Sequence, residues 1–367
     1  MSGMNPVVLI QLLMQYHNDY GRKNTPAART FAFNRNHRLI VHKETAEEVR
    51  KRKSHLSDRT VARSEEAVRK LLKKTLKGKT GKVWIDPKMR KIAVPLAMST
   101  GESGFGILPT GSRMDIPEGK FIRAFTYWEK VNDIDLSCFA ITEDGQQEEF
   151  SWRNMWGKQG EEIAYSGDQT SGYNGGSEYF DVDIDLFKAN HPGYRYIVFC
   201  NNVYSGINFN ECECKAGYMI RETNPEDVPT WKGERNDRDR VSTRQPVIFD
   251  PKTVQTSFRI NAESMFAYLF AIDLESREMV WLNLARSDNM RVAGMSQMEF
   301  LLRYLTITDV FNVGDLFSWA GEEVSSLEDA DIVISDEWGM SIAKPLQEGS
   351  EAVHSWDFEK MLRFLQP

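Results

Sequence analysis

The stretch Ser166–Asp185, SGDQTSGYNGGSEYFDVDID, joins a polar loop to an alternating segment, and the rest of the chain is organised around it. Its loop contains four glycines, which tolerate positive φ angles and close backbone approaches. Asp168, Asn174 and Glu178 place hard oxygen ligands among these turns, as Ca²⁺-binding loops do. The same residue types also form ordinary solvated hairpin loops. Composition alone therefore leaves both interpretations open.

The second half of this stretch predicts a strand, because polar and apolar residues alternate from Tyr179 to Leu186. In such a strand Asp181, Asp183 and Asp185 share one face. Like charges at this spacing repel one another. Either a bound cation or exposure to solvent would relieve the repulsion.

Neighbouring segments predict further short strands. In Asp133–Thr142 the apolar residues occupy one face, whereas Asp133 and Asp135 project together from the other. The near-continuous apolar run Tyr194–Val203 is typical of a central strand. Three more strands are expected at Val254–Ile260, Phe266–Leu274 and Met279–Leu284, and Val83–Trp128 is expected to flank the same body. Short strands separated by frequent turn signals favour a β-sandwich or barrel.

The composition is that of an ordinary soluble globular protein, with 41% hydrophobic and 27% charged residues in a chain of 367. This length allows two or three domains. No apolar run approaches the roughly 18 residues that span a bilayer, and the N-terminus reads as an amphipathic helix at Val7–Tyr20 rather than a signal peptide. The four cysteines, which include Cys212 and Cys214, lack zinc-site spacing. These features predict a cytoplasmic protein that does not span a membrane.

Charge is distributed unevenly along the chain. Between Arg22 and Lys91 there are 22 Lys and Arg against 7 Asp and Glu, a local charge of +15. Because the net charge of the whole chain is −7, the rest of the chain carries −22. Glu44–Leu76 predicts a long helix that Ser57-Asp58 could split by starting a new one. Within it, Arg50, Lys51, Arg52 and Lys53 could contact nucleic-acid phosphates or an anionic surface. They could equally form a solvated helix face.

The C-terminal part predicts helices and an acidic tract. Helices are expected at Gln297–Leu305, within Thr308–Ala320 and at Trp356–Leu365. The acidic segment Glu322–Glu337 contains Ile332–Ile334 as a candidate edge strand. The whole chain lacks a nucleophile–base pair, a P-loop, a dinucleotide fingerprint and a zinc-protease motif. We therefore expect a protein that is not an enzyme.

Three segments taken together resemble the TerD family, bacterial stress-response proteins named for tellurium-resistance gene clusters. They are DIDLSCFAITEDG (Asp133–Gly145), IAYSGDQTSGYNGGSEYFDVDIDL (Ile163–Leu186) and YRYIVFCNNVYSGINFNECECKAGYMIRE (Tyr194–Glu222). The order and spacing of D-x-D-L-S, S-G-D, G-x-E and the later S-G carry the resemblance, which covers roughly residues 120–225.

The resemblance implies a β-sandwich that binds Ca²⁺ through loop and strand carboxylates. Asp133, Asp135, Asp168 and Glu178 stand at the family's acidic positions, and Asn174 adds a loop oxygen. The sequence departs from the family at Gln169, where asparagine is usual, and at Gly176-Ser177, where an acidic run is usual. Fewer charged ligands imply one weakened Ca²⁺ site.

The sequence thus predicts a mainly β protein, α+β overall, in three regions: a basic helical region at 1–82, a TerD-like β-sandwich at 83–290 and an acidic helical tail at 291–367. The expected function is that of a non-enzymatic, Ca²⁺-binding scaffold or binding module that works with other stress-response proteins. The alternative is an adaptor that binds nucleic acid or an anionic surface through its basic N-terminal region, with a purely structural sandwich.

Overall fold

The computed structural model describes residues 4–17, 28–33, 38–43, 47, 57–96, 108–153, 162–222, 256–260, 263–286, 301, 305, 309–340 and 344–366. The chain divides into two compact units. One contains residues 1–35, 41–114 and 303–367, and the other contains residues 36–40 and 115–302. We call them the helical unit and the β unit.

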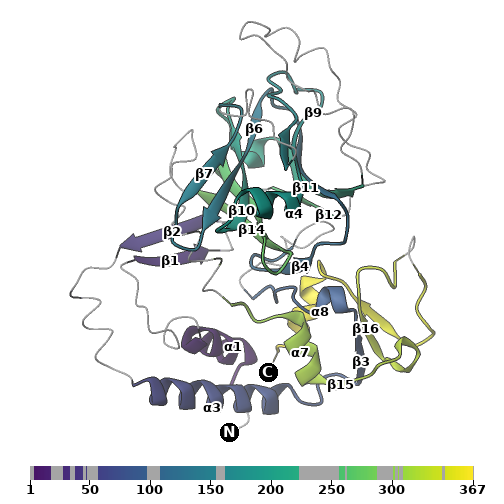
Figure 1. Cartoon of the computed structure of the whole chain (residues 1–367). Helices are drawn as coiled ribbons and strands as arrows, with labels where there is room; N and C mark the ends of the chain where they lie inside the picture. Colours follow the sequence, from purple (N-terminus) through teal and green to yellow (C-terminus); the bar gives the residue numbers. More distant parts are fainter. Residues whose placement is uncertain are drawn as a thin grey trace, which may run out of the picture. The chain divides into compact units, whose positions relative to one another are not determined.

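The β unit contains two layers of mostly antiparallel strands (Figure 1), although β2 (Arg38–Lys43) pairs in parallel with β14 (Glu278–Arg286) at Arg38 and Leu39. In the larger sheet β10 (Tyr194–Val203) lies between β6 (Ile134–Thr142) and β13 (Phe266–Asp273), with β7 (Gln147–Phe150) beyond β6 and β14 (Glu278–Arg286) beyond β13. The central position of β10 follows from its apolar sequence, since Ile197, Val198 and Phe199 are fully buried. The predicted central strand is confirmed.

The second sheet of the β unit has the order β12-β11-β5-β9-β8. These strands are β12 (Thr256–Arg259), β11 (Glu213–Arg221), β5 (Phe121–Glu129), β9 (Gly176–Val182) and β8 (Ile163–Tyr165). The two sheets meet through buried residues: the Phe180 and Phe199 rings lie 6.2 Å apart, and Asn201 Nδ2 donates to Thr126 Oγ1 at 2.7 Å. The three strands predicted after residue 250 form, with β12 in one sheet and β13 and β14 in the other.

One predicted strand is shorter than its sequence pattern. β9 ends at Val182, and Asp183 begins helix α4 (Ile184–Asn190) by accepting a hydrogen bond from Leu186 N at 3.0 Å. The prediction that Asp181, Asp183 and Asp185 share one strand face is therefore wrong. Asp183 satisfies a helix N-terminus instead, as an N-cap aspartate does.

The helical unit contains a four-stranded, all-parallel sheet in the order β15-β3-β16-β17. Its strands are β3 (Lys82–Ile85), β15 (Glu322–Glu323), β16 (Ile332–Ile334) and β17 (Glu351–Val353). The expectation that Val83–Trp128 flanks the sandwich is thus wrong for Val83–Ile85. Ile332–Ile334, predicted as an edge strand, lies between β3 and β17 and is buried.

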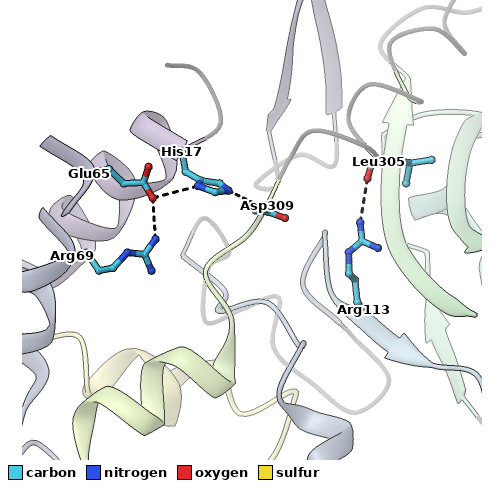
Figure 2. Close-up of polar contacts among 6 residues, drawn as sticks. All are labelled: His17, Glu65, Arg69, Arg113, Leu305 and Asp309. Atoms are coloured by element: carbon cyan, nitrogen blue, oxygen red, sulfur yellow. Dashed lines mark hydrogen bonds and ion pairs between the residues drawn. The ribbon is translucent and has the colours of Figure 1, made fainter. Parts of the chain in front are cut away.

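Helices α1 (Pro6–Gln15) and α3 (Asp58–Leu76) pack together in the helical unit. The predicted helical residues 18–20, 44–46 and 48–56 lie outside the described part of the chain. Ser57 begins α3 by accepting from Thr60 N at 3.2 Å, which confirms the predicted start there. Figure 2 shows His17, just beyond α1, contacting Glu65 Oε1 at 3.4 Å and Asp309 Oδ2 at 2.6 Å. Glu65 also pairs with Arg69 at 3.0 Å, and Arg113 donates to the Leu305 carbonyl at 3.1 Å.

The remaining elements are α7 (Val313–Ala320), α8 (Phe358–Arg363), β1 (Ala28–Phe33), β2 (Arg38–Lys43), β4 (Arg113–Asp115), η3 (Pro87–Met89), η5 (Phe209–Glu211) and η7 (Leu327–Asp329). The helices predicted in Thr308–Ala320 and Trp356–Leu365 correspond to α7 and α8. Most of the predicted helix Gln297–Leu305 lies outside the described residues.

The observed division differs from the three regions predicted in chain order. Residues 83–114 and 303–367 belong to one unit with the N-terminal helices, because the C-terminal strands pair with β3. In the part of the chain that the structure describes, no helix is both long and apolar enough to cross a bilayer.

Candidate metal centre

Three carboxylates from two separate segments converge in the β unit. Asp133 and Asp135 lie at the start of β6, and Asp168 lies in the loop between β8 and β9. Each offers an oxygen that lies within 4.8 Å of the others. We call these residues the carboxylate cluster. The sequence prediction that these three residues come together is confirmed.

Asp133 and Asp135 reach the cluster together because they are two residues apart at the beginning of an extended segment. The segment that follows β10 holds Asp133 in place, since the Asp133 N–H donates to Ser205 Oγ at 3.2 Å. Asp135 pairs in register with Asn202 of β10, and Asn202 Nδ2 donates to Asp135 Oδ2 at 3.3 Å.

Glu178 joins the Asp168 loop to β6. Its side chain is fully buried, its Oε2 accepts from Leu136 N at 2.7 Å, and its Oε1 accepts from Gln169 N at 3.0 Å. It was predicted as a ligand. In the structure it lies beside the cluster and holds both ligand-bearing segments in position.

The loop glycines are needed for packing against Trp128. A Cβ on Gly172 would lie 2.4 Å from Trp128 Nε1, and one on Gly176 would lie 2.5 Å from Trp128 Cε2. Gly175 adopts φ +125°, an angle that residues other than glycine rarely adopt. The glycines therefore seat the loop on the indole ring and bring Asp168 to its place.

Gln169 closes the same loop. Its Oε1 accepts from Ser177 N at 2.9 Å, and its own N–H donates to Oε1 of Glu178, the residue after Ser177. Asn174, also predicted as a ligand, lies further along the loop with its side chain exposed. The structure thus places Gln169 in the loop framework and Asn174 at its surface.

Burial and mutual repulsion make the cluster electrostatically unfavourable in the absence of a cation. Burial, with the charges of Asp135 and Asp168, raises the pKa of Asp133 from 3.8 to about 7. Burial and Asp168 raise the pKa of Asp135 to about 6, against the opposing effects of Asn202 and Arg153. Burial also raises the pKa of Asp168. A divalent cation would offset this repulsion directly.

Two buried oxygens of the cluster, Asp133 Oδ1 and Asp168 Oδ1, have no hydrogen-bond partner among the described residues, and neither has Oδ1 of the neighbouring Asn202. Asn202 is only 8% exposed, and its bond to Asp135 directs its amide toward the cluster. Unsatisfied buried oxygens are costly unless something binds them. Their chemistry, hard oxygens without nitrogen or sulfur, fits a hard cation such as Ca²⁺ or Mg²⁺.

Sequence reasoning did not select Asn202. The signal was present, because Asn202 lies on the strand predicted to be central, where a polar residue needs a partner. Only the β6–β10 register shows that this partner is Asp135.

The three aspartates once expected on a single strand face have separate partners. Asp181 forms a bidentate ion pair with Arg123, with both N–O distances 2.7 Å, and both side chains are 1% exposed. Asp183 caps α4, and Asp185 is exposed beside Arg277 at 3.3 Å. These carboxylates therefore do not contribute to the cluster.

The predicted anion-binding residues Arg50, Lys51, Arg52 and Lys53 lie outside the described residues. The four cysteines are buried thiols, and burial raises the pKa of Cys214 to about 12. Buried thiols of this kind are poor metal ligands and nucleophiles.

Comparison with known proteins adds no relative: no protein-family model, no curated protein and no solved structure matches this chain.

Proposed function

We propose that this protein is a Ca²⁺-binding module of the kind found in TerD-like stress-response proteins, acting as a non-catalytic scaffold for partner proteins. The observation that carries the proposal is the carboxylate cluster, in which Asp133 and Asp168 each have a buried oxygen without a hydrogen-bond partner among the described residues. The motif resemblance described above supports the family.

Calcium is favoured over other cations by the ligand chemistry. Zinc prefers nitrogen and sulfur ligands, and the cluster offers only oxygens. Magnesium requires near-ideal octahedral geometry, whereas Ca²⁺ accepts irregular sets of six to eight oxygens. The candidate oxygens come from the start of β6, the loop between β8 and β9, and the neighbouring strand β10. Such a mixed set suits Ca²⁺ better than Mg²⁺.

A calcium titration followed by calorimetry and thermal melting tests this proposal. When the free calcium concentration is about 100 times the Kd of the site, binding stabilises the fold by about 2.7 kcal/mol. Asp168→Ala is expected to abolish both the heat of binding and the thermal shift. The matched control is Asp185→Ala, because Asp185 is 83% exposed and outside the cluster. Absence of any response of the wild-type protein to millimolar calcium would refute the proposal.

A second function is favoured by the exposed face of α3, which supports the adaptor alternative. Arg59, Arg63, Lys70, Lys74 and Lys77 are all exposed, and their spacing places them within about 60° around the helix axis. They form a basic stripe about 27 Å long. Glu66, which pairs with Lys70 at 2.9 Å, is the acidic residue within it.

Binding of a fluorescent DNA duplex at several salt concentrations tests the adaptor alternative. If all five cations of the stripe contact phosphates, raising salt from 50 to 200 mM should weaken binding by about 500-fold. The charge reversal Lys70→Glu with Lys74→Glu should reduce this salt dependence. Lys188→Glu, at an exposed site on α4, should leave it unchanged. Absence of duplex binding at low salt would eliminate this function.

A further inference from the structure

Three neighbouring parallel strands of the helical unit end in polar residues. Asp86 follows β3, Ser335 and Asp336 follow β16, and His354 and Ser355 follow β17. The last residue of β16 pairs in register with the last residues of both β3 and β17. Because the three strands are parallel, the five polar residues meet at one edge of the sheet. We call these five residues the carboxyl edge.

This edge contains a topological switch point of the sheet. The next strand of the sheet after β3 is β15, which lies on one side of β3. The next strand after β16 is β17, which lies on the opposite side. Open α/β sheets bind their ligands at such a point, just beyond the carboxyl ends of the strands.

His354 is a buried and oriented hydrogen-bond acceptor within this edge. The residue is 7% exposed, its ring stacks on Trp356 with centroids 4.9 Å apart, and its Nδ1 lies 2.7 Å from the Ser335 carbonyl oxygen. A carbonyl can only accept, so Nδ1 carries the hydrogen and the neutral ring has its lone pair on Nε2. None of the described residues donates a hydrogen bond to that nitrogen.

Asp336 provides a second acceptor next to His354. Its Oδ1 accepts from Ser355 N at 2.7 Å, and a carboxylate has about four lone-pair sites, so it can accept further hydrogen bonds. Burial raises the pKa of Asp336, against the opposing effects of Ser355 and of the His354 charge. The carboxylate and the imidazole therefore lie within electrostatic reach of each other.

Asp86 and Ser335 form the framework that holds His354. Asp86 Oδ2 accepts from Ser335 Oγ at 2.9 Å, and Asp86 Oδ1 accepts from Lys88 N at 3.0 Å. Ser335 is fully buried, and its hydroxyl also accepts from Glu337 N at 3.1 Å. This fixed residue presents the carbonyl that orients the imidazole.

The chemistry of the edge selects a neutral ligand with hydrogen-bond donors. Among the described residues, three potential metal-ligand atoms converge only at the carboxylate cluster, so the carboxyl edge is not a metal site of that kind. The charges of Asp86 and Asp336 oppose a phosphate, and Lys88 is already paired with Glu337 at 2.7 Å. No glycine-rich phosphate loop follows β3. Two neighbouring acceptors suit two neighbouring hydroxyl groups.

We propose that the carboxyl edge binds the ribose of an unphosphorylated nucleoside, whose two neighbouring hydroxyls donate to His354 Nε2 and to the Asp336 carboxylate. Nucleotide-binding α/β folds use an acidic side chain at the same edge to accept from a ribose hydroxyl. The half-buried Trp356 ring beside His354 provides an aromatic surface for the base. The inference concerns the helical unit and does not rest on the calcium function.

Calorimetric titration of the full-length protein with adenosine, guanosine, cytidine and uridine, in the presence of chelator, tests the proposal. At least one of the four should bind. Its 2′,3′-dideoxy analogue should bind about tenfold more weakly or worse, because it lacks both donors. Its 5′-monophosphate should bind no more tightly than the nucleoside, because it brings negative charge to an acidic edge.

Two substitutions locate the site. His354→Asn removes Nε2 and keeps an amide donor for the Ser335 carbonyl, whereas Asp336→Asn removes the charge and keeps an acceptor for Ser355 N. Each should weaken binding by about tenfold or more. The matched control is Glu348→Gln, at an exposed position between β16 and β17, which should bind as the wild type does. Thermal melting establishes that each variant is folded.

Several results would overturn the inference. They are failure of all four nucleosides to bind at millimolar concentration, equal binding of the dideoxy analogue, tighter binding of the monophosphate, and unchanged affinity in both variants. If one variant melts below the assay temperature, the other variant and the comparison of analogues on the wild type decide. Calcium enters none of these measurements, so failure here leaves the proposed function intact.

Discussion

Replacing Asp133 with asparagine is expected to stabilise the cation-free protein above neutral pH and to abolish its response to calcium. The substitution keeps the shape of the side chain and removes a charge that is 8% exposed and faces two other carboxylates. A buried charge without a partner destabilises the folded state. Its removal should therefore stabilise the fold, although most core substitutions do the opposite.

The magnitude follows from the shift in the Asp133 pKa from 3.8 to about 7. One pKa unit corresponds to about 1.4 kcal/mol, so the charged form costs the folded state about 4 kcal/mol at pH 8. The asparagine amide must itself find partners, which leaves an expected gain of about 2 kcal/mol. In a unit of this size that gain raises the Tm by about 4–8 °C.

The pH dependence has a definite sign. The unfolded chain releases the Asp133 proton near pH 3.8, whereas the folded protein retains it up to about pH 7. Within that window the folded state binds more protons, so the stability of the cation-free wild type falls as pH rises. At pH 5 the advantage of Asp133→Asn should shrink to less than half its value at pH 8.

Thermal melting in chelator and in calcium, at pH 5 and pH 8, measures each of these effects. Asp185→Asn is the matched control, because the same chemical change at an exposed aspartate should shift the Tm little. An Asp133→Asn protein that melts below the wild type in chelator at pH 8 would show that the carboxylate is not a repelled, buried charge. Retention of the full calcium response would show that Asp133 is not a ligand.

Two further substitutions test the framework around the cluster by urea denaturation. Gly172→Ala should destabilise the β unit by about 1–3 kcal/mol, because its Cβ would overlap the Trp128 ring. The control Gly145→Asn, at an open turn with φ +89°, should cost little. Equal effects of the two substitutions would contradict the packing role of the loop. Arg123→Met should lower the free energy of unfolding by about 3–5 kcal/mol, because it leaves Asp181 buried and unpaired. Adding Asp181→Leu should recover much of that loss. A double variant no more stable than Arg123→Met alone would contradict this account.

The strands of the β unit could be predicted from local patterns. Alternation in Asp133–Thr142 and the apolar run Tyr194–Val203 correspond to β6 and β10. The same alternation placed Asp133 and Asp135 on a common face, and the loop composition identified Asp168. Side-chain direction in a strand is a local property, so the sequence contains it.

Long-range pairing could not be predicted in the same way. β3 pairs in parallel with β16, whose residues lie about 250 positions further along the chain. Nothing in the sequence of Lys82–Ile85 specifies that partner, because any short apolar strand offers the same backbone groups. For this reason residues 83–114 were grouped with the sandwich, and Ile332–Ile334 was expected at a sheet edge.

The partners of individual carboxylates decide which of them can bind a cation, and this depends on tertiary structure. Asp181 and Asp183 occur in the same alternating pattern as Asp133 and Asp135. Arg123 neutralises Asp181, however, and the first turn of α4 satisfies Asp183. Asp133 and Asp168 each retain a buried oxygen that no donor in the described part of the chain reaches. Because an unpaired buried oxygen is costly, the fold keeps such atoms together where a cation can bind them, and the carboxylate cluster is where this chain does so.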